Sequence, residues 1–137
     1  MSPAALALVL ALAQGAAAPV KPAAAPRPTP APTRSEAPPY EADMLRLAEL
    51  MGALAYLRDL CRDGDGAAFR DRIGQLIAAD PRPQEAKDQL AGAFNRGFDG
   101  YRLTYRVCTS NARTTIAAYL DETQRISRDL AAKYGGG

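Results

Sequence analysis

Two cysteines, Cys61 and Cys108, constrain the fold of this 137-residue chain more than any other feature. Each lies near the end of a stretch expected to be helical, and both follow an N-terminus that is typical of an export signal. Cysteine pairs in exported proteins usually form structural disulfides, whereas catalytic dithiols usually stand close together as Cys-x-x-Cys. We therefore predict one structural bridge between Cys61 and Cys108. A redox pair and two free thiols are the alternatives.

The N-terminus predicts export to the periplasm. Ala4–Ala13 is an apolar stretch of about ten residues, which is the length of the hydrophobic region of a secretory signal, although no Lys or Arg precedes it. Ala13 and Gly15 place small residues at the −3 and −1 positions of a cleavage site, so we expect residues 1–15 to be a signal peptide. Pro19 interrupts the apolar stretch well before the ~20 residues that a membrane span needs. An uncleaved anchor is the alternative.

Residues 16–39 are expected to form a disordered linker. They include eight prolines and eight alanines in 24 residues. Proline fixes φ and removes a backbone donor, so the segment favours an extended polyproline-type chain that reaches about 70 Å. The linker is either a passive tail or a spacer that holds the domain off a membrane or presents a proline-rich ligand.

Residues 40–137 are expected to form an all-α domain of about four helices. Apolar residues recur at three- and four-residue intervals, as on one face of a helix. Gly64, Pro81 and Pro83 mark the breaks, Asp65 is placed to cap the second helix, and Thr109, Ser110 or Asn111 the fourth. The four apolar stripes are Leu47, Leu50, Met51, Leu54, Leu57 and Cys61; Phe69, Ile73, Leu76 and Ile77; Leu90, Phe94, Phe98, Tyr101, Tyr105 and Cys108; and Ile116, Leu120, Ile126 and Leu130.

Short connections between these helices predict a small antiparallel bundle. The first helix, from about residue 41 to 61, and the third, from about 83 to 108, then end at the same pole. Cys61 and Cys108 lie at those two ends, so the topology and the cysteines agree on a bundle closed by one disulfide. The bridge closes a loop of 48 residues, for which chain entropy predicts a stabilisation of about 4 kcal/mol.

Composition excludes several classes of function. From residue 40 onward the chain has 14 basic and 14 acidic residues, so it lacks the excess of Lys and Arg that nucleic-acid binding needs. Histidine is absent, and two cysteines alone do not make a standard zinc site. The stretch 63–66 (DGDG) lacks the rest of a calcium loop. We expect no cofactor, no metal, no catalytic residues and no nucleic-acid partner.

A polar line on the third helix is a candidate interaction strip. The helical spacing of Asn95, Asp99, Arg102 and Arg106 places them on one face beside the aromatic stripe. Arginine is enriched at protein interfaces and forks onto carboxylates and phosphates. The strip is either a contact surface for an envelope or periplasmic protein or an ordinary solvated face with weak ion pairs.

The aromatic stripe of the same helix is a candidate apolar pocket. Phe94, Phe98, Tyr101 and Tyr105 stand where a cavity between helices would be lined. This pattern supports an alternative function, the binding of a small apolar ligand. Alternatively, the aromatic stripe is simply the face of the helix that packs in the core.

Three glycines, Gly92, Gly97 and Gly100, interrupt the third helix. Each costs about 1 kcal/mol relative to alanine in a helix interior. We expect them to mark a kink or the close approach of another helix, with a ligand against the backbone as the alternative.

Two segments, LAELMGALAYLRDLC and GAFNRGFDGYRLTYRVCTSNARTTIAAYLDE, carry a family resemblance. Their marks are the Tyr-Leu-Arg-x-Leu-Cys ending, the Phe-Asn-Arg-Gly stretch and the Tyr-x-x-Cys-Thr junction. Residues 45–134 resemble a family of small secreted alphaproteobacterial proteins that is catalogued as a domain of unknown function. The resemblance implies a periplasmic setting and transfers no catalytic residues.

Together these features predict a non-enzymatic module for protein interaction or envelope maintenance in the periplasm, without a stable membrane span after signal cleavage. The small-ligand binder is the alternative. An enzyme is the least favoured class, because no nucleophile motif or phosphate-binding loop is present.

Overall fold

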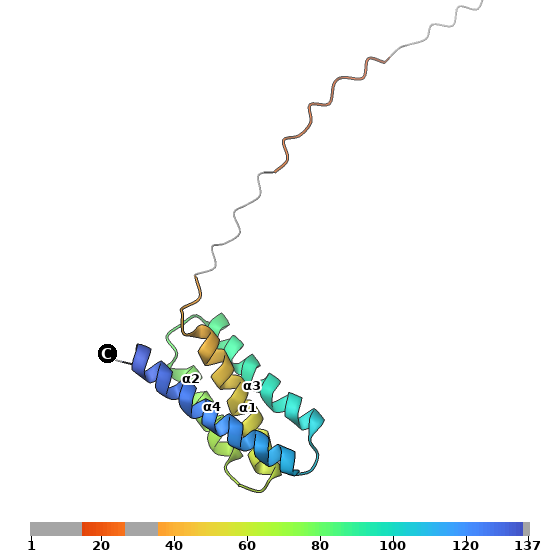
Figure 1. Cartoon of the computed structure of the whole chain (residues 1–137). Coiled ribbons are helices and arrows are strands. Elements are labelled where there is room, and N and C mark those ends of the chain that lie inside the picture. The colour runs from red at the N-terminus through yellow and green to blue at the C-terminus, as the bar shows by residue number, and fades with distance from the viewer. Residues whose placement is uncertain (1–14, 27–35, 136–137) are drawn as a thin grey trace, which may run out of the picture. The chain divides into compact units, whose positions relative to one another are not determined.

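The computed structural model describes residues 15–26 and 36–135 of the chain (Figure 1). Residues 15–26 are exposed and form neither helix nor strand. Except for Gly15, the predicted signal peptide lies outside the described residues, and so does the part of the predicted linker between residues 27 and 35.

Residues 36–135 form four helices and no strand, which confirms the predicted all-α bundle. The helices are α1 (Glu41–Leu60), α2 (Gly66–Ala79), α3 (Gln84–Thr104) and α4 (Ser110–Tyr134). In Figure 1 the α1–α2 and α3–α4 connections lie at one end of the bundle, and the α2–α3 connection lies at the other. None of the helices in the described part of the chain is long and apolar enough to cross a membrane.

Helix α1 is the central element of the bundle. The other three helices all pack on it, whereas the α4 backbone comes close to neither α2 nor α3. Between Leu47 and Leu57 only Glu49 and Tyr56 are more than slightly exposed. The predicted single stripe on this helix is therefore too narrow, because small residues outside it are buried as well. These are Ala48, Gly52, Ala53 and Ala55.

The core is built mainly from apolar residues of α1, joined by Leu90, Ala93 and Phe94 of α3. Leu50, Leu54, Leu57 and Leu90 are the largest side chains that are fully buried. Burying a leucine completely is worth about 1.5–3 kcal/mol relative to leaving it in water. These leucines belong to one buried apolar cluster that residues of all four helices share.

The helix directions confirm the predicted topology. Cys61 and Cys108 form a disulfide with an S–S distance of 2.03 Å, so the C-terminal ends of α1 and α3 lie at one pole, which we call the disulfide pole. At the opposite pole the rings of Tyr40, before α1, and Tyr134, at the end of α4, are 5.3 Å apart. Helix α4 therefore runs antiparallel to α1.

Helix α3 ends earlier than predicted. It stops at Thr104, because Tyr105 has an extended backbone. The hydroxyl of Tyr56 on α1 donates a hydrogen bond to the carbonyl oxygen of Tyr105, which holds this backbone away from the helical path. Arg106 and Cys108 consequently lie in the α3–α4 connection rather than on α3.

The helix caps match the prediction at one position and correct it at another. The Thr109 hydroxyl caps α4 by accepting a hydrogen bond from the Ala112 amide at 3.0 Å. Asp65 stands at the N-cap of α2, but its carboxylate pairs with Arg58 and makes no cap bond. Asp59 of α1 accepts from the Gly66 amide at 2.9 Å instead. The cap of α2 is thus supplied by the preceding helix.

Two glycines allow α1 and α3 to meet backbone to backbone. A Cβ added at Gly52 would overlap the carbonyl oxygen of Phe94, and one added at Gly97 would overlap the carbonyl oxygen of Glu49. Only glycine fits such a contact without moving one of the helices.

The close approach predicted for three glycines of α3 holds for Gly97 alone. A Cβ at Gly100 would meet nothing within 4 Å, and one at Gly92 would meet only the end of the Arg96 side chain at 3.5 Å. Both positions face away from α1, so the spacing of glycines did not identify the contact by itself.

A buried ion pair closes the pole opposite the disulfide. The Arg82 guanidinium donates to the Asp80 carboxylate at 2.7 Å, lies 3.5 Å from the Glu41 carboxylate and packs 5.6 Å from the centre of the Tyr40 ring. Only 4% of the Asp80 side chain and 11% of the Arg82 side chain are exposed. This cluster ties the α2–α3 connection to the start of α1.

Replacing Asp80 with asparagine is expected to lower the free energy of unfolding at pH 7 by about 2 kcal/mol, because a buried charged hydrogen bond is lost. The Arg82 side chain lowers the pKa of the Asp80 carboxyl by hydrogen bonding. The ionised Asp80 carboxylate therefore stabilises the fold fully above the unfolded-state pKa of about 3.9. This stabilisation is lost as the pH falls through the lower pKa that Asp80 has in the folded state.

Urea titrations of wild type and D80N from pH 7 to pH 2.5 would measure this effect. The stability difference should shrink below about pH 4. The exposed Asp88→Asn control should stay within about 0.5 kcal/mol of wild type. A difference between wild type and D80N that does not change with pH would contradict the assignment.

Candidate interaction surface

The predicted strip is exposed along its whole length. Asn95, Asp99 and Arg102 lie on the exposed side of α3, and Arg106 follows in the α3–α4 connection. Asp99 accepts a hydrogen bond from the Arg102 guanidinium at 3.2 Å, and both side chains are more than half exposed. An ion pair so exposed adds little to stability. The charged groups of the strip therefore face solvent and contribute little to the stability of the fold.

Two large apolar side chains stand next to the strip. Leu103 is 71% exposed and Val107 is 67% exposed. Isolated exposed apolar residues are common on protein surfaces, but these two flank the charged strip at the end of a helix. Sequence reasoning missed both. The available signal was that Leu103 lies outside the aromatic stripe of the third helix. We call Asn95, Asp99, Arg102, Leu103, Arg106 and Val107 the α3 surface.

The backbone beneath the end of the α3 surface is held in place from two sides. The disulfide joins Cys108 to the end of α1. The Tyr105 carbonyl accepts from Tyr56, and the Tyr105 hydroxyl accepts from the Asn111 side chain at 2.6 Å. Arg106 and Val107 therefore lie between Tyr105, which is held by hydrogen bonds, and Cys108, which is held by the disulfide.

The four aromatic residues of the predicted pocket form two stacked pairs. The rings of Phe94 and Phe98 stack with their centres 6.5 Å apart, and those of Tyr101 and Tyr105 stack at 6.1 Å. Tyr119 of α4 lies edge-on to Tyr101 at 5.7 Å. None of the four lines either hollow described below. The binding of a small apolar ligand among them stays a prediction.

Tyr101 has a partly buried phenol group. Burial raises the pKa of its phenol, and a hydrogen bond with the Tyr119 hydroxyl raises it further. Its ring packs edge-on to Tyr119, so Tyr101 links α3 to α4.

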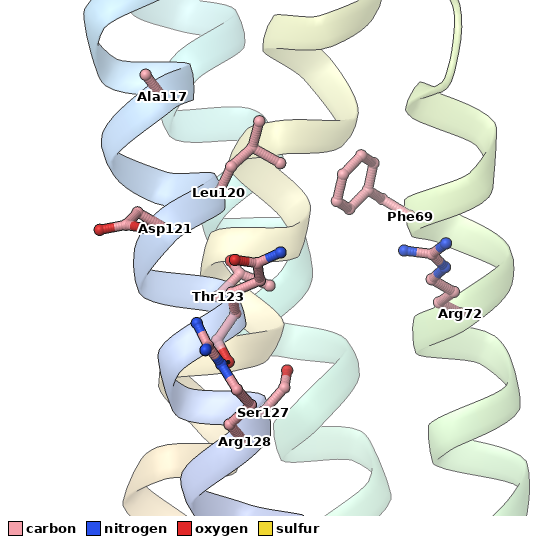
Figure 2. A pocket seen from close by; sticks show the side chains of 9 residues that line it. Phe69, Arg72, Ala117, Leu120, Asp121, Thr123, Ser127 and Arg128 are labelled. Atoms are coloured by element: carbon pink, nitrogen blue, oxygen red, sulfur yellow. Dashed lines mark hydrogen bonds between the residues drawn. The ribbon is translucent and has the colours of Figure 1, made fainter.

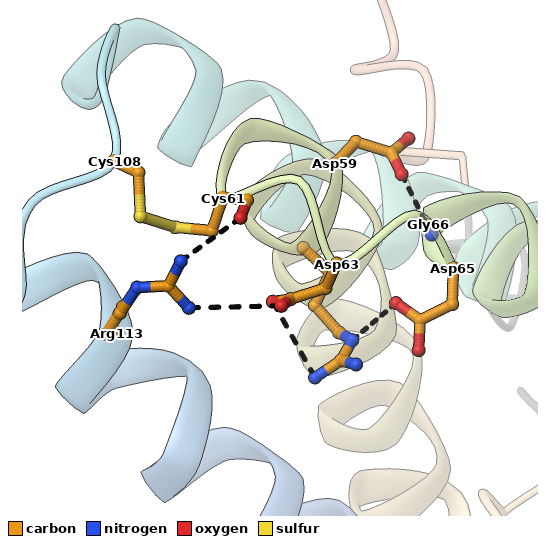
Figure 3. A network of polar contacts seen from close by, with 8 residues as sticks. Asp59, Cys61, Asp63, Asp65, Gly66, Cys108 and Arg113 are labelled. Carbon is orange, nitrogen blue, oxygen red and sulfur yellow. Dashed lines mark hydrogen bonds and ion pairs between the residues drawn. A yellow bond between two sulfur atoms is a disulfide. The ribbon is translucent and has the colours of Figure 1, made fainter.

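The disulfide pole carries a network of arginines and aspartates (Figure 3). The Arg113 guanidinium of α4 donates to the carbonyl oxygen of Cys61 at 3.2 Å and lies 3.8 Å from the Asp63 carboxylate. Arg58 pairs with Asp63 and with Asp65, and hydrogen bonding from Arg58 lowers the pKa of Asp65. The acidic residues of the α1–α2 connection are thus used in internal contacts.

A hollow of about 390 Å³ opens next to the disulfide. We call it the disulfide hollow. Its lining contains three arginines and no acidic residue. The lining residues are Leu60, Cys61, Arg62, Arg106, Val107, Cys108 and Arg113.

A larger groove of about 730 Å³ lies between α2 and α4 (Figure 2). Phe69 and Arg72 point from α2 toward α4, and residues of α4 form the other wall. The groove exists because both helices pack on α1 and their backbones do not approach each other. Its charged groups have mixed signs, with Arg72 and Arg128 opposed by Asp121. It therefore offers no single charge to a ligand.

The described residues bring together no cluster of three side chains that would suit a metal ion. The expectations of no metal and no cofactor stay predictions.

The architecture is that of a small all-α domain in which one disulfide joins the ends of two helices around a buried central helix. A family model described as "Protein of unknown function (DUF2385)" matches residues 39–134, and the chain belongs to that family. This match confirms the predicted resemblance to a family of unknown function. The alphaproteobacterial origin and the secretion that the resemblance implied stay predictions. No curated protein and no solved structure matches the chain.

Proposed function

We propose that this protein is a non-enzymatic interaction module of the bacterial periplasm, and that the α3 surface binds a partner protein of the envelope. The observation that carries the proposal is the exposure of Leu103 and Val107, at 71% and 67%, beside Arg102 and Arg106. An apolar centre with a charged rim is the usual anatomy of a protein interface. The surface therefore has the composition of a binding site.

The charges of the surface define the chemistry of the partner. Among the described residues Arg106 makes no ion pair, and the only acidic side chain of the surface, Asp99, is already paired with Arg102. The surface is thus positive around its apolar centre. The matching partner is a protein with an apolar pocket that is flanked by carboxylates.

The fixed backbone of the α3–α4 connection favours binding. A surface that is already ordered loses little conformational freedom when its partner docks. The disulfide and the hydrogen bonds of Tyr105 supply this order at the end of the α3 surface.

Location in the periplasm is supported by two features of the chain. The apolar stretch before residue 15 has the length of a signal sequence, and a structural disulfide is compatible with an oxidising compartment. The Pro/Ala-rich residues 16–39 would then separate the domain from the site of signal cleavage.

The proposal is tested by placing a photo-crosslinking amino acid at Val107 of the full chain in living cells. We expect one discrete adduct in the envelope fraction, and none from the same group at the exposed Ala118 of α4. Charge reversal in R102E/R106E should lower the adduct yield about tenfold, because both arginines then repel an acidic partner. Circular dichroism should show an unchanged helix content.

The matched control is R72E/R128E, which changes the net charge by the same amount on the two walls of the α2–α4 groove. This variant should keep the adduct. Retention of the adduct in R102E/R106E, or its loss in R72E/R128E alone, would contradict binding through the α3 surface.

A further inference from the structure

We propose that the disulfide hollow is a binding site for a phosphate-bearing anion. This inference goes beyond the protein-binding function proposed above. It rests on the arginines that converge next to the Cys61–Cys108 bridge.

Three separate segments supply the positive charge. Arg62 follows the end of α1, Arg106 lies in the α3–α4 connection, and Arg113 lies in the first turn of α4. No acidic side chain lines the hollow, and the nearest carboxylate in contact is that of Asp63, 3.8 Å from Arg113. Three guanidinium groups around one cavity repel each other, and a multiply charged anion between them removes that repulsion.

The arginines keep free donors. Among the described residues Arg62 and Arg106 form no ion pair, and Arg113 commits one hydrogen bond to the Cys61 carbonyl and lies near Asp63. Each guanidinium has five N–H donors. Arginine forks match the oxygens of a phosphate group, so three of them favour a phosphate over a single carboxylate.

Arg62 has the left-handed backbone conformation that ends α1. Its φ is +62°, the left-handed region, and it is the only non-glycine residue of the described chain with a positive φ. The Arg62 amide donates to the Asp59 carbonyl oxygen at 3.1 Å, and the Asp63 amide donates to the Arg58 carbonyl oxygen at 2.8 Å, a helix-ending pattern in which this position is usually glycine. An arginine is less favourable than glycine in this conformation. The chain therefore carries an arginine that lines the hollow at a helix end where glycine is the usual residue.

The disulfide brings the site together. Arg62 is next to Cys61, and Arg106 is two residues before Cys108, so the bridge places side chains from distant parts of the sequence around one hollow. Figure 3 shows Arg113 reaching across to the Cys61 carbonyl oxygen. This contact holds the third arginine of the lining next to the disulfide.

The site is tested by titrating inorganic pyrophosphate into the oxidised full chain and following backbone amide resonances. We expect saturable shifts centred on Arg62, Val107 and Arg113. R62G and R106Q should each weaken binding about tenfold, because each removes charged hydrogen bonds. R62G should also keep or raise the thermal midpoint, since glycine is more favourable than arginine in this backbone conformation. Weaker binding would then not be explained by unfolding.

Two further measurements separate the sources of the phosphate group. Sedimentation with vesicles of phosphatidylglycerol, compared with phosphatidylcholine, tests a lipid headgroup, and pyrophosphate tests a soluble one. Binding of pyrophosphate or of phosphatidylglycerol vesicles that is lost in R62G and R106Q but kept in the control R96Q supports the site. The probe that binds shows whether the phosphate group belongs to a soluble anion or to a lipid headgroup. No saturable binding of either probe, or equal loss in R96Q, overturns the site. Crosslinking from Val107 in R62G, in which the α3 surface is intact, tests the proposed protein partner separately.

Discussion

Replacing both cysteines with serine is expected to lower the free energy of unfolding by about 4 kcal/mol, the chain-entropy value for a closed loop of this length. The bridge joins residues 47 positions apart, so the open chain regains a large set of unfolded conformations. For a domain of about 100 residues this corresponds to a fall in the thermal midpoint of about 15–30 °C. Since small domains have total stabilities of only about 5–15 kcal/mol, the bridge is a major part of the stability.

Thermal and urea unfolding followed by circular dichroism would measure the effect in C61S/C108S. The matched control is unfolding in the presence of a reductant. Reductant should lower the free energy of unfolding of the wild type by a similar amount and should not change that of the variant. A fall of less than about 1 kcal/mol would mean that the packing of α1 against α3 fixes the pole without the bridge. The same comparison shows whether the domain is stable in a reducing compartment.

The fold follows from signals that are local in the sequence. The glycine and proline breaks at Gly64, Pro81 and Pro83 mark the end of α1, both ends of α2 and the start of α3. Short connections between these helices favour antiparallel packing of neighbours. The cysteines then had to meet at one pole, and they do. The helix breaks and the short connections could be recognised in the sequence because each depends on residues that are close together in the chain.

The central position of α1 depends on contacts that are distant in the sequence. Ala48, Ala53 and Ala55 are small and compatible with either a buried or an exposed helix face. Their burial follows from the packing of α2, α3 and α4 around one helix. An apolar pattern on one helix does not specify how many neighbours surround it.

The α3 surface could be predicted only in part. The exposure of Asn95, Asp99 and Arg102 follows from their place beside the apolar stripe. The position of Arg106 and Val107 depends on where α3 ends, and that is decided by the hydrogen bond from Tyr56 to the Tyr105 carbonyl. This contact links residues 49 positions apart, so no local pattern reveals it.

Adding one methyl group at Gly97 is expected to lower the free energy of unfolding by about 3 kcal/mol, the upper part of the range for overpacked cores. The new Cβ would overlap the Glu49 carbonyl oxygen and approach the Ala53 amide on α1. Both are backbone atoms of the central helix, so no side chain can rotate away to make room. The gain of about 1 kcal/mol in helix propensity from glycine to alanine is too small to offset this.

The same substitution at Gly100 provides the matched control within α3, because its Cβ would meet nothing within 4 Å. G100A should therefore raise the free energy of unfolding by up to about 1 kcal/mol through helix propensity alone. Urea titrations of the two variants should thus shift in opposite directions from wild type. A G97A variant as stable as wild type would require α1 and α3 to move apart at no cost in free energy. The buried core residues of the two helices, Leu50 and Leu54 of α1 and Leu90 of α3 among them, oppose such a separation. The sign of the difference between G97A and G100A is consequently a direct test of the close approach of the two helices.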